Sequence, residues 1–409
     1  MSGFTTRAVH APFLKKDPHG ALHMPVYESV SFEFETAEEI EDAFLGKRPR
    51  HTYTRTTNPT VEHLEQKIKH ITGACGVVAV SSGMAAIANI ILSIARQGEN
   101  LVTTRFVFGN TYSLFERTLK PWGLETRYAD FARPETIEPL IDANTRGLFF
   151  ETITNPQLEV ADIQTLAAIA CRHQILLIAD TTMTPLYFFN SKDYGVDIEV
   201  LSSTKYVSGG ATTVGGIIID NGTYNWARIP KLEKEAKQFG PFTLLMKLKR
   251  EVYRNLGACL APHNAYLQSL GLETLALRAD RSCHNTKALA EFLRRHPKAK
   301  KVNYPGLESS PYHEVAARIF GERCGALVTF ELSSKKKCFA FLNKLKLLRR
   351  ATNIHDNKTL ALHPASTIFG EYPADLKRQM GVPETLIRLS VGIEDVEDLL
   401  ADVAQALED

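Results

Sequence analysis

A lysine and an aspartate follow two short apolar runs, and both residue types can bind and activate a small molecule. The β-prone run 198–201 leads into three hydroxyl side chains, then Lys205, then glycines within 209–216. Asp180 follows the apolar run 175–179. Burial lowers the pKa of a lysine and frees its amine for Schiff-base chemistry with an aldehyde. A lysine at a strand end is more often simply solvated, so this interpretation needs support from the remaining chain.

Strands and helices alternate from residue 61 onward, and they must position these two side chains. Such an alternation favours a mostly parallel sheet with helices on both faces. Because such sheets bind ligands beyond the carboxyl ends of their strands, we expect Asp180 and Lys205 at one edge. The sequence predicts strands at 76–81, 100–104, 147–152, 175–179, 198–201 and 215–220, and helices at 61–71, 85–94 and 111–120.

Two further features would complete a cofactor site. The small-residue turn 82–84 precedes a helix, so its backbone N–H groups can face a phosphate, together with Ser202 and Thr204. Phe108, in the next loop, can lie flat on an aromatic ring. An imine-forming lysine, an aspartate for a pyridinium nitrogen, a phosphate cup and a stacking face are what pyridoxal 5′-phosphate requires. The alternatives are that Asp180 and the turn cap helices and that Phe108 packs in the core.

Length, charge and cysteine spacing limit the class of protein. A chain of 409 residues with 44% hydrophobic residues is long enough for two or three core-bearing units. The net charge of +2 gives no electrostatic reason to expect nucleic acid or an anionic membrane as a partner. No apolar run approaches the ~20 residues of a membrane helix, and none resembles a signal peptide. The six cysteines form no C-x-x-C pair, so we expect no metal site and no disulfides, but thiols in a reducing cytoplasm.

Three segments are expected along the chain. Residues 1–60 show little helical periodicity and contain several prolines and glycines, which predicts an extended arm lying on another subunit. Residues 61–258 would form the sheet domain. Residues 259–409 would form a smaller α+β domain, joined by a linker helix over 255–277 that Pro262 interrupts. Further helices are predicted at 282–295, 335–348 and 396–407.

Several motifs recur in one enzyme family. They are YTRTTNPT (53–60), SSGMAAI (81–87), FGNTY (108–112), ETITNP (151–156), ADTTMTPL (179–186), SSTKYVSGG (202–210), HPAST (363–367) and IRLSVGIED (387–395). With them, the chain from about Pro25 onward resembles the Cys/Met-metabolism, or transsulfuration, family of pyridoxal-phosphate enzymes. That resemblance implies the aspartate-aminotransferase-like fold, fold type I. Residues 211–226 and 250–278 are similar to the O-acetylhomoserine sulfhydrylase branch.

The resemblance implies a role for each matched residue. Lys205 would carry the cofactor aldehyde and move a proton, Asp180 would pair with the pyridine nitrogen, and Phe108 would stack on the ring. Arg388 would bind the substrate's α-carboxylate through paired hydrogen bonds, with Asn353 beside it. The other implied cofactor contacts are Asn155 at the phenolic oxygen, Gly83, Met84, Ser202 and Thr204 at the phosphate, Thr182, and Tyr53 and Arg55 from a neighbouring subunit.

Three positions depart from the family pattern. Phe108 stands where tyrosine is usual, so stacking is kept but the phenol, commonly assigned to proton transfer, is lost. This leaves the identity of any general acid open. Thr181 replaces an asparagine. His355 stands where glycine is common, and residues 368–370 replace a Thr-His segment, so a different substrate entrance is expected.

These patterns favour γ-replacement on O-acetyl-L-homoserine. Acetate would leave Cγ, and sulfide or a small thiol would replace it, giving homocysteine or a thioether such as methionine. A carboxylate leaves without a proton whereas a thiolate leaves better with an acid beside it, so phenylalanine at 108 suits acetate departure. A succinyl or phospho ester, a cystathionine γ-synthase, a methionine γ-lyase and a non-covalent phosphate-ligand binding protein remain alternatives. The family also suggests a homotetramer, built as a dimer of dimers.

Overall fold

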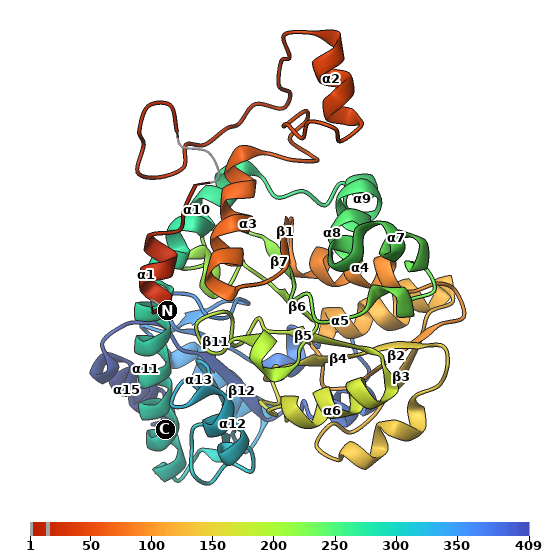
Figure 1. Cartoon of the computed structure of the whole chain (residues 1–409). Helices are drawn as coiled ribbons and strands as arrows, with labels where there is room; N and C mark the ends of the chain where they lie inside the picture. The colour runs from red at the N-terminus through yellow and green to blue at the C-terminus, as the bar shows by residue number, and fades with distance from the viewer. Residues whose placement is uncertain (1–2, 14–16, 409) are drawn as a thin grey trace.

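A computed structural model describes residues 3–13 and 17–408, so residues 1–2 and 14–16 of the expected arm and residue 409 lie outside the description. The described chain contains two sheets with helices packed around them, and an N-terminal segment that extends from the body (Figure 1). This is the α/β architecture expected from the alternating sequence pattern.

The larger sheet has seven strands and is mostly parallel, which confirms the expected fold class. β7 runs antiparallel to both of its neighbours, and all other neighbouring pairs are parallel. The strand order is β1 (Gly76–Val80), β7 (Gly216–Asp220), β6 (Ile198–Leu201), β5 (Leu176–Asp180), β4 (Thr145–Glu151), β2 (Asn100–Thr103) and β3 (Glu125–Tyr128).

Helices cover this sheet because most of its strands are buried on both faces. β1, β4, β6 and β7 are buried at every position, so each face needs an apolar partner. Asn58 caps the first covering helix through hydrogen bonds from the N–H groups of Thr60 and Val61. The helices of this part of the chain are α3 (Pro59–Thr72), α4 (Gly83–Ile94), α5 (Gly109–Ser113), α6 (Ile163–His173), α7 (Glu233–Phe239), α8 (Thr243–Lys247) and α9 (Tyr253–Leu256).

Strand register brings the predicted chemical residues to one edge. Glu151, the last residue of β4, pairs with Asp180, the last residue of β5, and Asp180 pairs with Val200 of β6. Lys205 follows the end of β6 after a short turn in which its N–H bonds to the oxygen of Ser202. The carboxyl ends of three neighbouring parallel strands therefore meet at the position expected for a ligand site.

The N-terminal segment contains two short helices, where little helical structure was expected. α1 (Phe4–Val9) packs against α3, α10 and α11, whereas α2 (Ala37–Phe44) projects from the body and buries none of its residues (Figure 1). Thr36 caps α2 by accepting a hydrogen bond from Glu39 N, and acidic residues occupy its first turn. The cap and the acidic first turn therefore favour this helix locally, although none of its residues is buried.

The C-terminal part contains the second sheet and a long connecting helix pair. Pro262 begins α10 (Pro262–Glu273) rather than interrupting a helix, because the first turn needs no N–H from this residue. α11 (Leu275–Arg295) is continuous, so the helix predicted at 282–295 begins earlier than expected. The five-stranded sheet has the order β10 (Arg349–Arg350), β11 (Leu360–Leu362), β12 (Leu386–Ser390), β9 (Leu327–Glu331) and β8 (Lys300–Asn303). The helices of this part of the chain are α12 (His313–Phe320), α13 (Lys335–Lys344), α14 (Ala374–Gln379) and α15 (Val396–Leu407).

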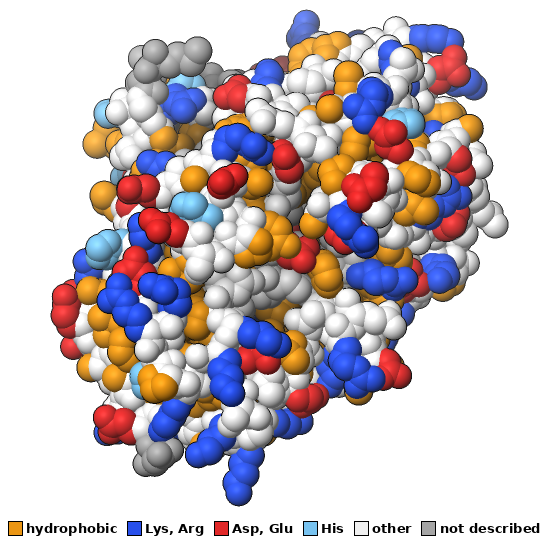
Figure 2. Space-filling model, turned by 90° about the horizontal axis from the view of Figure 1, so that it is seen from below, with side chains coloured by type: hydrophobic (Ala, Val, Ile, Leu, Met, Phe, Trp, Pro, Cys, Tyr) orange, Lys and Arg blue, Asp and Glu red, His pale blue; other side chains and the backbone are white. Residues whose placement is uncertain are grey.

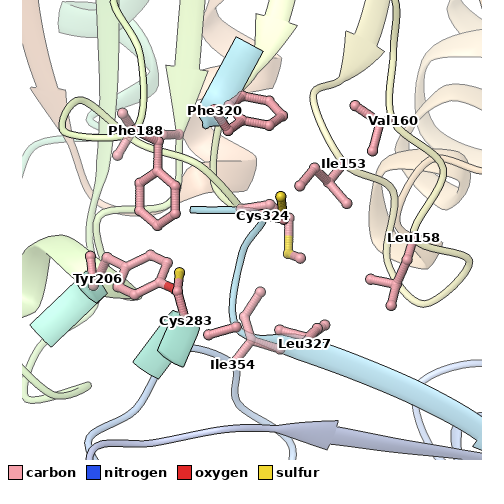
Figure 3. Packing of buried hydrophobic residues seen from close by; sticks show 14 of the residues in the cluster. Ile153, Leu158, Val160, Phe188, Tyr206, Cys283, Phe320, Cys324, Leu327 and Ile354 are labelled. Carbon is pink, nitrogen blue, oxygen red and sulfur yellow. The ribbon is translucent and has the colours of Figure 1, made fainter. Parts of the chain in front are cut away.

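One apolar core joins the two sheets. Tyr206 follows the lysine turn, Leu327 lies on β9, and Ile354 lies on the loop between β10 and β11; all belong to one buried cluster (Figure 3). On the outside, charges of both signs are interspersed over the face shown in Figure 2. No helix among the described residues is long and apolar enough to cross a membrane.

Candidate active site

A cavity of about 300 Å³ lies at the carboxyl ends of β4, β5 and β6. The strands supply its floor, the turn before α4 and the loop before α5 supply one wall, and the second sheet supplies the opposite wall. Its lining residues are Ser82, Gly83, Met84, Ile87, Phe108, Asn110, Thr111, Glu151, Asn155, Asp180, Thr182, Met183, Ser202, Lys205, Thr352, Ile354 and Arg388.

Most of the site residues predicted from the sequence meet at this cavity. Thr204 and Asn353 lie next to it without lining it, whereas Tyr53 and Arg55 lie elsewhere in the chain. The predicted residues that line it are Gly83, Met84, Phe108, Asn155, Asp180, Thr182, Ser202, Lys205 and Arg388.

The amine of Lys205 is held at the cavity wall. Its Nζ donates a hydrogen bond of 2.5 Å to Oδ1 of Asn353. Burial and, to a smaller extent, the positive charge of Arg388 together lower the pKa of Lys205 to about 8. A substantial fraction of neutral amine is therefore present near neutral pH, which condensation with an aldehyde requires.

Two carboxyl groups stand side by side on the cavity floor. Asp180 Oδ1 accepts a hydrogen bond of 2.9 Å from Thr182 N, and Glu151 Oε1 accepts one of 2.5 Å from Phe108 N. Burial raises the pKa of each carboxyl, and the charge of Asp180 raises that of Glu151 further. A cationic ring nitrogen beside Asp180 would compensate the cost of keeping this carboxylate ionised.

The turn before α4 has the shape of a phosphate cup. Ser82 caps the helix by accepting a hydrogen bond of 3.1 Å from Ala85 N, and the next two residues line the cavity. A side chain at Gly83 would lie 2.7 Å from Cβ of Ser202, so glycine is needed for this close approach. Ser202 N in turn donates to Thr182 Oγ1 at 2.9 Å.

Thr204 is placed differently from its expected position around a phosphate. Its hydroxyl donates to the oxygen of Gly215 at 3.2 Å and accepts from the N–H of Gly215 at 3.1 Å. Both bonds join the lysine turn to the residue before β7, and the side chain of Thr204 does not line the cavity. The assignment of Thr204 as a phosphate ligand therefore stays a prediction.

Arg388, on β12, lines the cavity and carries one buried N–H group without a hydrogen-bond partner. It is 2% exposed; Nη1 donates to Asn155 Oδ1 at 3.0 Å and Nη2 to the oxygen of Asn353 at 3.1 Å. Its Nε has no partner in the described structure, and burial lowers the pKa of Arg388 to about 9. A substrate carboxylate would satisfy both the charge and the free N–H group.

Two departures from the family pattern do not lie at the cavity surface. His355 is buried, with its ring stacked on Tyr206 at 4.0 Å and its Nε2 3.3 Å from Met183 Sδ. Phe369 is also buried and packs with Tyr372 behind the loop that carries Phe108. Neither side chain lines the cavity, and the different substrate entrance expected from these positions stays a prediction.

Sequence comparison identifies the family. The profile of the Cys/Met metabolism PLP-dependent enzymes matches residues 5–408. The chain belongs to this family. It is therefore a pyridoxal-phosphate-dependent enzyme with fold type I.

Three known proteins are similar to this chain over nearly their whole length. An O-acetylhomoserine sulfhydrylase structure from Wolinella succinogenes is 44% identical with a TM-score of 0.81, and all of both chains is covered. A Campylobacter jejuni structure assigned as an O-acetylhomoserine (thiol)-lyase is 32% identical, with a TM-score of 0.94 over all of both chains; it holds pyridoxyl-lysine-5′-monophosphate at its position 205. An L-methionine gamma-lyase from Pseudomonas putida is 34% identical, over 100% of this chain and 98% of that protein.

The cavity of this family member fits pyridoxal phosphate by its own chemistry. It offers an amine of lowered pKa, a carboxyl for a ring nitrogen, an aromatic face at Phe108 and a glycine cup at a helix N-terminus. Lys205, Asp180 and Gly83 stand on three different segments, and the fold brings them to one cavity.

Sequence reasoning did not assign a role to several lining residues. Glu151 is the one with an ionisable side chain. The others include Asn110, Met183 and Ile354. A signal for Glu151 was present, because a carboxylate at the end of an otherwise apolar strand is expensive to bury. Its register with Asp180 could not be read from the chain alone.

Proposed function

We propose that this enzyme catalyses γ-replacement on O-acetyl-L-homoserine with sulfide or a small thiol, releasing acetate and homocysteine or a thioether. When bound, pyridoxal phosphate supplies an aldehyde that condenses with amines and a ring that withdraws electrons from the adjacent carbon atoms. In the proposed reaction the C–O bond at Cγ breaks, the electron pair leaves with acetate, and sulfur forms the new bond at Cγ.

The enzyme's own residues have distinct tasks in this proposal. Lys205 removes the proton from Cα and returns it, because its amine has a lowered pKa and stands at the cavity. Arg388 binds the α-carboxylate and thereby fixes the direction of the Cα–H bond. Asp180 presents a negative charge to the ring nitrogen, and Phe108 confines the ring from one face.

The composition of the cavity wall supports an ester as substrate. Among the described residues of its own chain that line it there is no tyrosine, cysteine or histidine; the two carboxyl groups, Glu151 and Asp180, lie on the floor, and Phe108 occupies the position at which the resemblance implies a phenol. Acetate leaves as a stable anion, whereas a thiolate leaving from methionine benefits from a proton donor. This single observation favours replacement on the acetyl ester over elimination from a thioether.

Methionine γ-elimination is the second candidate, because the relative from Pseudomonas putida is an L-methionine gamma-lyase of comparable similarity over the whole chain. Steady-state assays separate the two activities. We expect homocysteine from O-acetyl-L-homoserine and sulfide at a kcat/KM far above that for ammonia release from methionine. Efficient ammonia release from methionine without homocysteine formation from the ester would overturn the proposal. O-succinyl and O-phospho esters, assayed in parallel, identify the acyl group.

We further propose that residues 1–60 act as an arm that completes the site of a neighbouring subunit. Tyr53 is 43% exposed and Arg55 donates to the oxygen of Arg254, so neither reaches the cavity of its own chain. The same segment leaves apolar side chains uncovered, among them Leu22 and Phe44. A dimer, paired again into a tetramer, would cover these surfaces and bring Tyr53 and Arg55 to the second cavity.

Subunit complementation tests the arm. Lys205→Ala and Arg55→Ala homo-oligomers are expected to be nearly inactive. Mixed and refolded together, they should form hybrids in which one cavity has both an intact lysine and an intact arginine, so activity returns. Failure of every mixture to regain activity, or full activity in dilute monomeric wild-type protein, would exclude a shared site.

A further inference from the structure

Glu151 is a buried carboxyl group at the cavity to which no role has yet been given. It is 6% exposed, it ends β4, and it pairs in register with Asp180 at the end of β5. Side chains at paired positions of neighbouring parallel strands point to the same face, with the strands about 4.8 Å apart. Both carboxyl groups line the cavity, and none of the ion pairs among residues 3–13 and 17–408 includes Glu151.

Two such carboxyl groups cannot both be ionised at low energetic cost. Burial and the neighbouring negative charge both favour the protonated form of one member of the pair. Each carboxyl accepts a backbone N–H, Asp180 from Thr182 and Glu151 from Phe108, so these bonds do not distinguish them. Asp180 is the more exposed of the two and is therefore better placed to keep its charge toward a cationic ring. The proton therefore belongs on Glu151, whose pKa is raised by burial and by Asp180.

The same carboxyl group holds the backbone of the stacking residue. Glu151 Oε1 accepts the 2.5 Å hydrogen bond from Phe108 N, and Phe108 directly precedes α5 without any side-chain cap of its own. Burial raises the pKa of Glu151 overall, and the backbone of Asn155 partly lowers it. Glu151 thus ties the end of β4 to the loop that carries Phe108.

We propose that Glu151 is a positioning residue that remains protonated in the cofactor-loaded enzyme, leaving Asp180 as the single charged carboxylate at the ring while it fixes Phe108 against the ring face. The inference rests on cofactor binding and holds for either candidate reaction. Its failure would therefore leave the choice between γ-replacement and γ-elimination unchanged.

Glutamine and alanine at position 151 separate the two parts of this proposal. Glutamine reproduces a neutral carboxyl group that can still accept from Phe108 N, whereas alanine removes the acceptor. We expect Glu151→Gln to keep the dissociation constant of pyridoxal phosphate within about 2-fold and to keep the visible circular dichroism of the bound cofactor. Glu151→Ala should raise that constant by about 10-fold or more, as one lost hydrogen bond implies, and should weaken the dichroism.

Glu199 provides a matched control, because it is an equally buried carboxyl on β6 that does not line the cavity. Its oxygens accept hydrogen bonds from Thr181 and Ser191. Glu199→Ala should lower the melting temperature of the holoenzyme without changing the visible dichroism. An equal loss of dichroism in Glu199→Ala would show that Glu151 acts through general stability, and this would overturn the positioning role.

Two further results would refute the protonated state. One is a Glu151→Gln enzyme that loses cofactor as readily as Glu151→Ala, which would mean that a carboxylate is needed at this position. The second measurement needs no stable alanine variant: infrared spectra of the wild-type holoenzyme should contain a protonated-carboxyl carbonyl band that Glu151→Gln lacks. If the two spectra are identical in that region, Glu151 is ionised.

Discussion

Nζ of Lys205 lies 2.5 Å from Oδ1 of Asn353, and the backbone oxygen of Asn353 accepts a hydrogen bond from Arg388. One residue of the second sheet's loop therefore holds both the amine at the end of β6 and the guanidinium of β12. Because an amide oxygen accepts from an amine without adding charge, this contact orients Lys205 while its pKa stays low.

The charge at position 353 should control the pH dependence of cofactor uptake. Only neutral amine attacks an aldehyde, so the rate at which cofactor-free enzyme takes up pyridoxal phosphate should rise with pH, with a midpoint near the pKa of about 8, and level off at higher pH. Asn353→Asp places a carboxylate at the amine and favours the ammonium form, so the curve should move about 1–3 units to higher pH. Stopped-flow absorbance measures this rate.

Asn357 supplies the control for that experiment. It lies on the same loop, but its Nδ2 donates to the oxygen of Gly209 rather than contacting the amine. Asn357→Asp should leave the midpoint near that of the wild type. An unshifted curve for Asn353→Asp would contradict the assignment of Asn353 as the amine's partner.

Arg388→Lys should weaken substrate binding more than it changes the bound reaction. A lysine keeps the charge but loses the paired geometry that a carboxylate uses, and it leaves Asn155 and the oxygen of Asn353 without their present donors. Loss of a hydrogen bond to a charged group costs about 1.5–3 kcal/mol, which corresponds to about a 10–100-fold higher KM for the amino-acid ester. A KM within 2-fold of the wild type, measured by steady-state kinetics, would remove Arg388 from the carboxylate site.

Gly83→Ala should weaken cofactor binding through a steric clash. The added methyl group would lie 2.7 Å from Cβ and 3.0 Å from Cα of Ser202, and the backbone cannot yield as a flexible side chain can. Such overpacking costs about 1–3 kcal/mol, so the dissociation constant of pyridoxal phosphate should rise by about 10-fold. Gly3→Ala, with no atom within 4 Å of the added methyl, is the control. Equal cofactor affinity in both variants would argue against a cup at Gly83.

Phe108→Tyr should shift the balance between replacement and elimination. The phenol would restore a proton donor at the cavity wall, which assists departure of a thiolate more than departure of acetate. We expect ammonia release from methionine to increase by about 10-fold or more, within the range typical of general acids, with a much smaller change for the acetyl ester. Parallel assays of both substrates give this ratio; an unchanged ratio would show that residue 108 does not set the reaction preference.

The sheet was predictable from the sequence where its strands are mostly apolar and fully buried. The run 198–201 becomes β6 with the predicted limits, because every position is buried. β3, with the sequence Glu-Thr-Arg-Tyr, escaped prediction because it is an edge strand with no fully buried residue. α11 begins at Leu275, although the sequence suggested 282, because its burial comes from tertiary contacts with the second sheet rather than from a local signal.

The site was predictable where a residue's chemistry follows from its place at a strand end. Lys205 and Asp180 are of this kind. Contacts across the fold were not predictable: the hydroxyl of Thr204 exchanges hydrogen bonds with Gly215, which precedes β7, and His355 is buried against Tyr206. That Glu151 lies beside Asp180 follows only from the pairing of β4 with β5, which depends on strand order and not on sequence spacing.

Borohydride reduction of the purified holoenzyme, followed by peptide mass analysis, tests the central claim most directly. Reduction converts an imine between a lysine and pyridoxal phosphate into a stable secondary amine. We expect one modified peptide, with the pyridoxyl group on Lys205, loss of the visible absorbance band, and no such band in Lys205→Ala. A pyridoxyl group on a different lysine, or a coloured Lys205→Ala enzyme with wild-type activity, would contradict it.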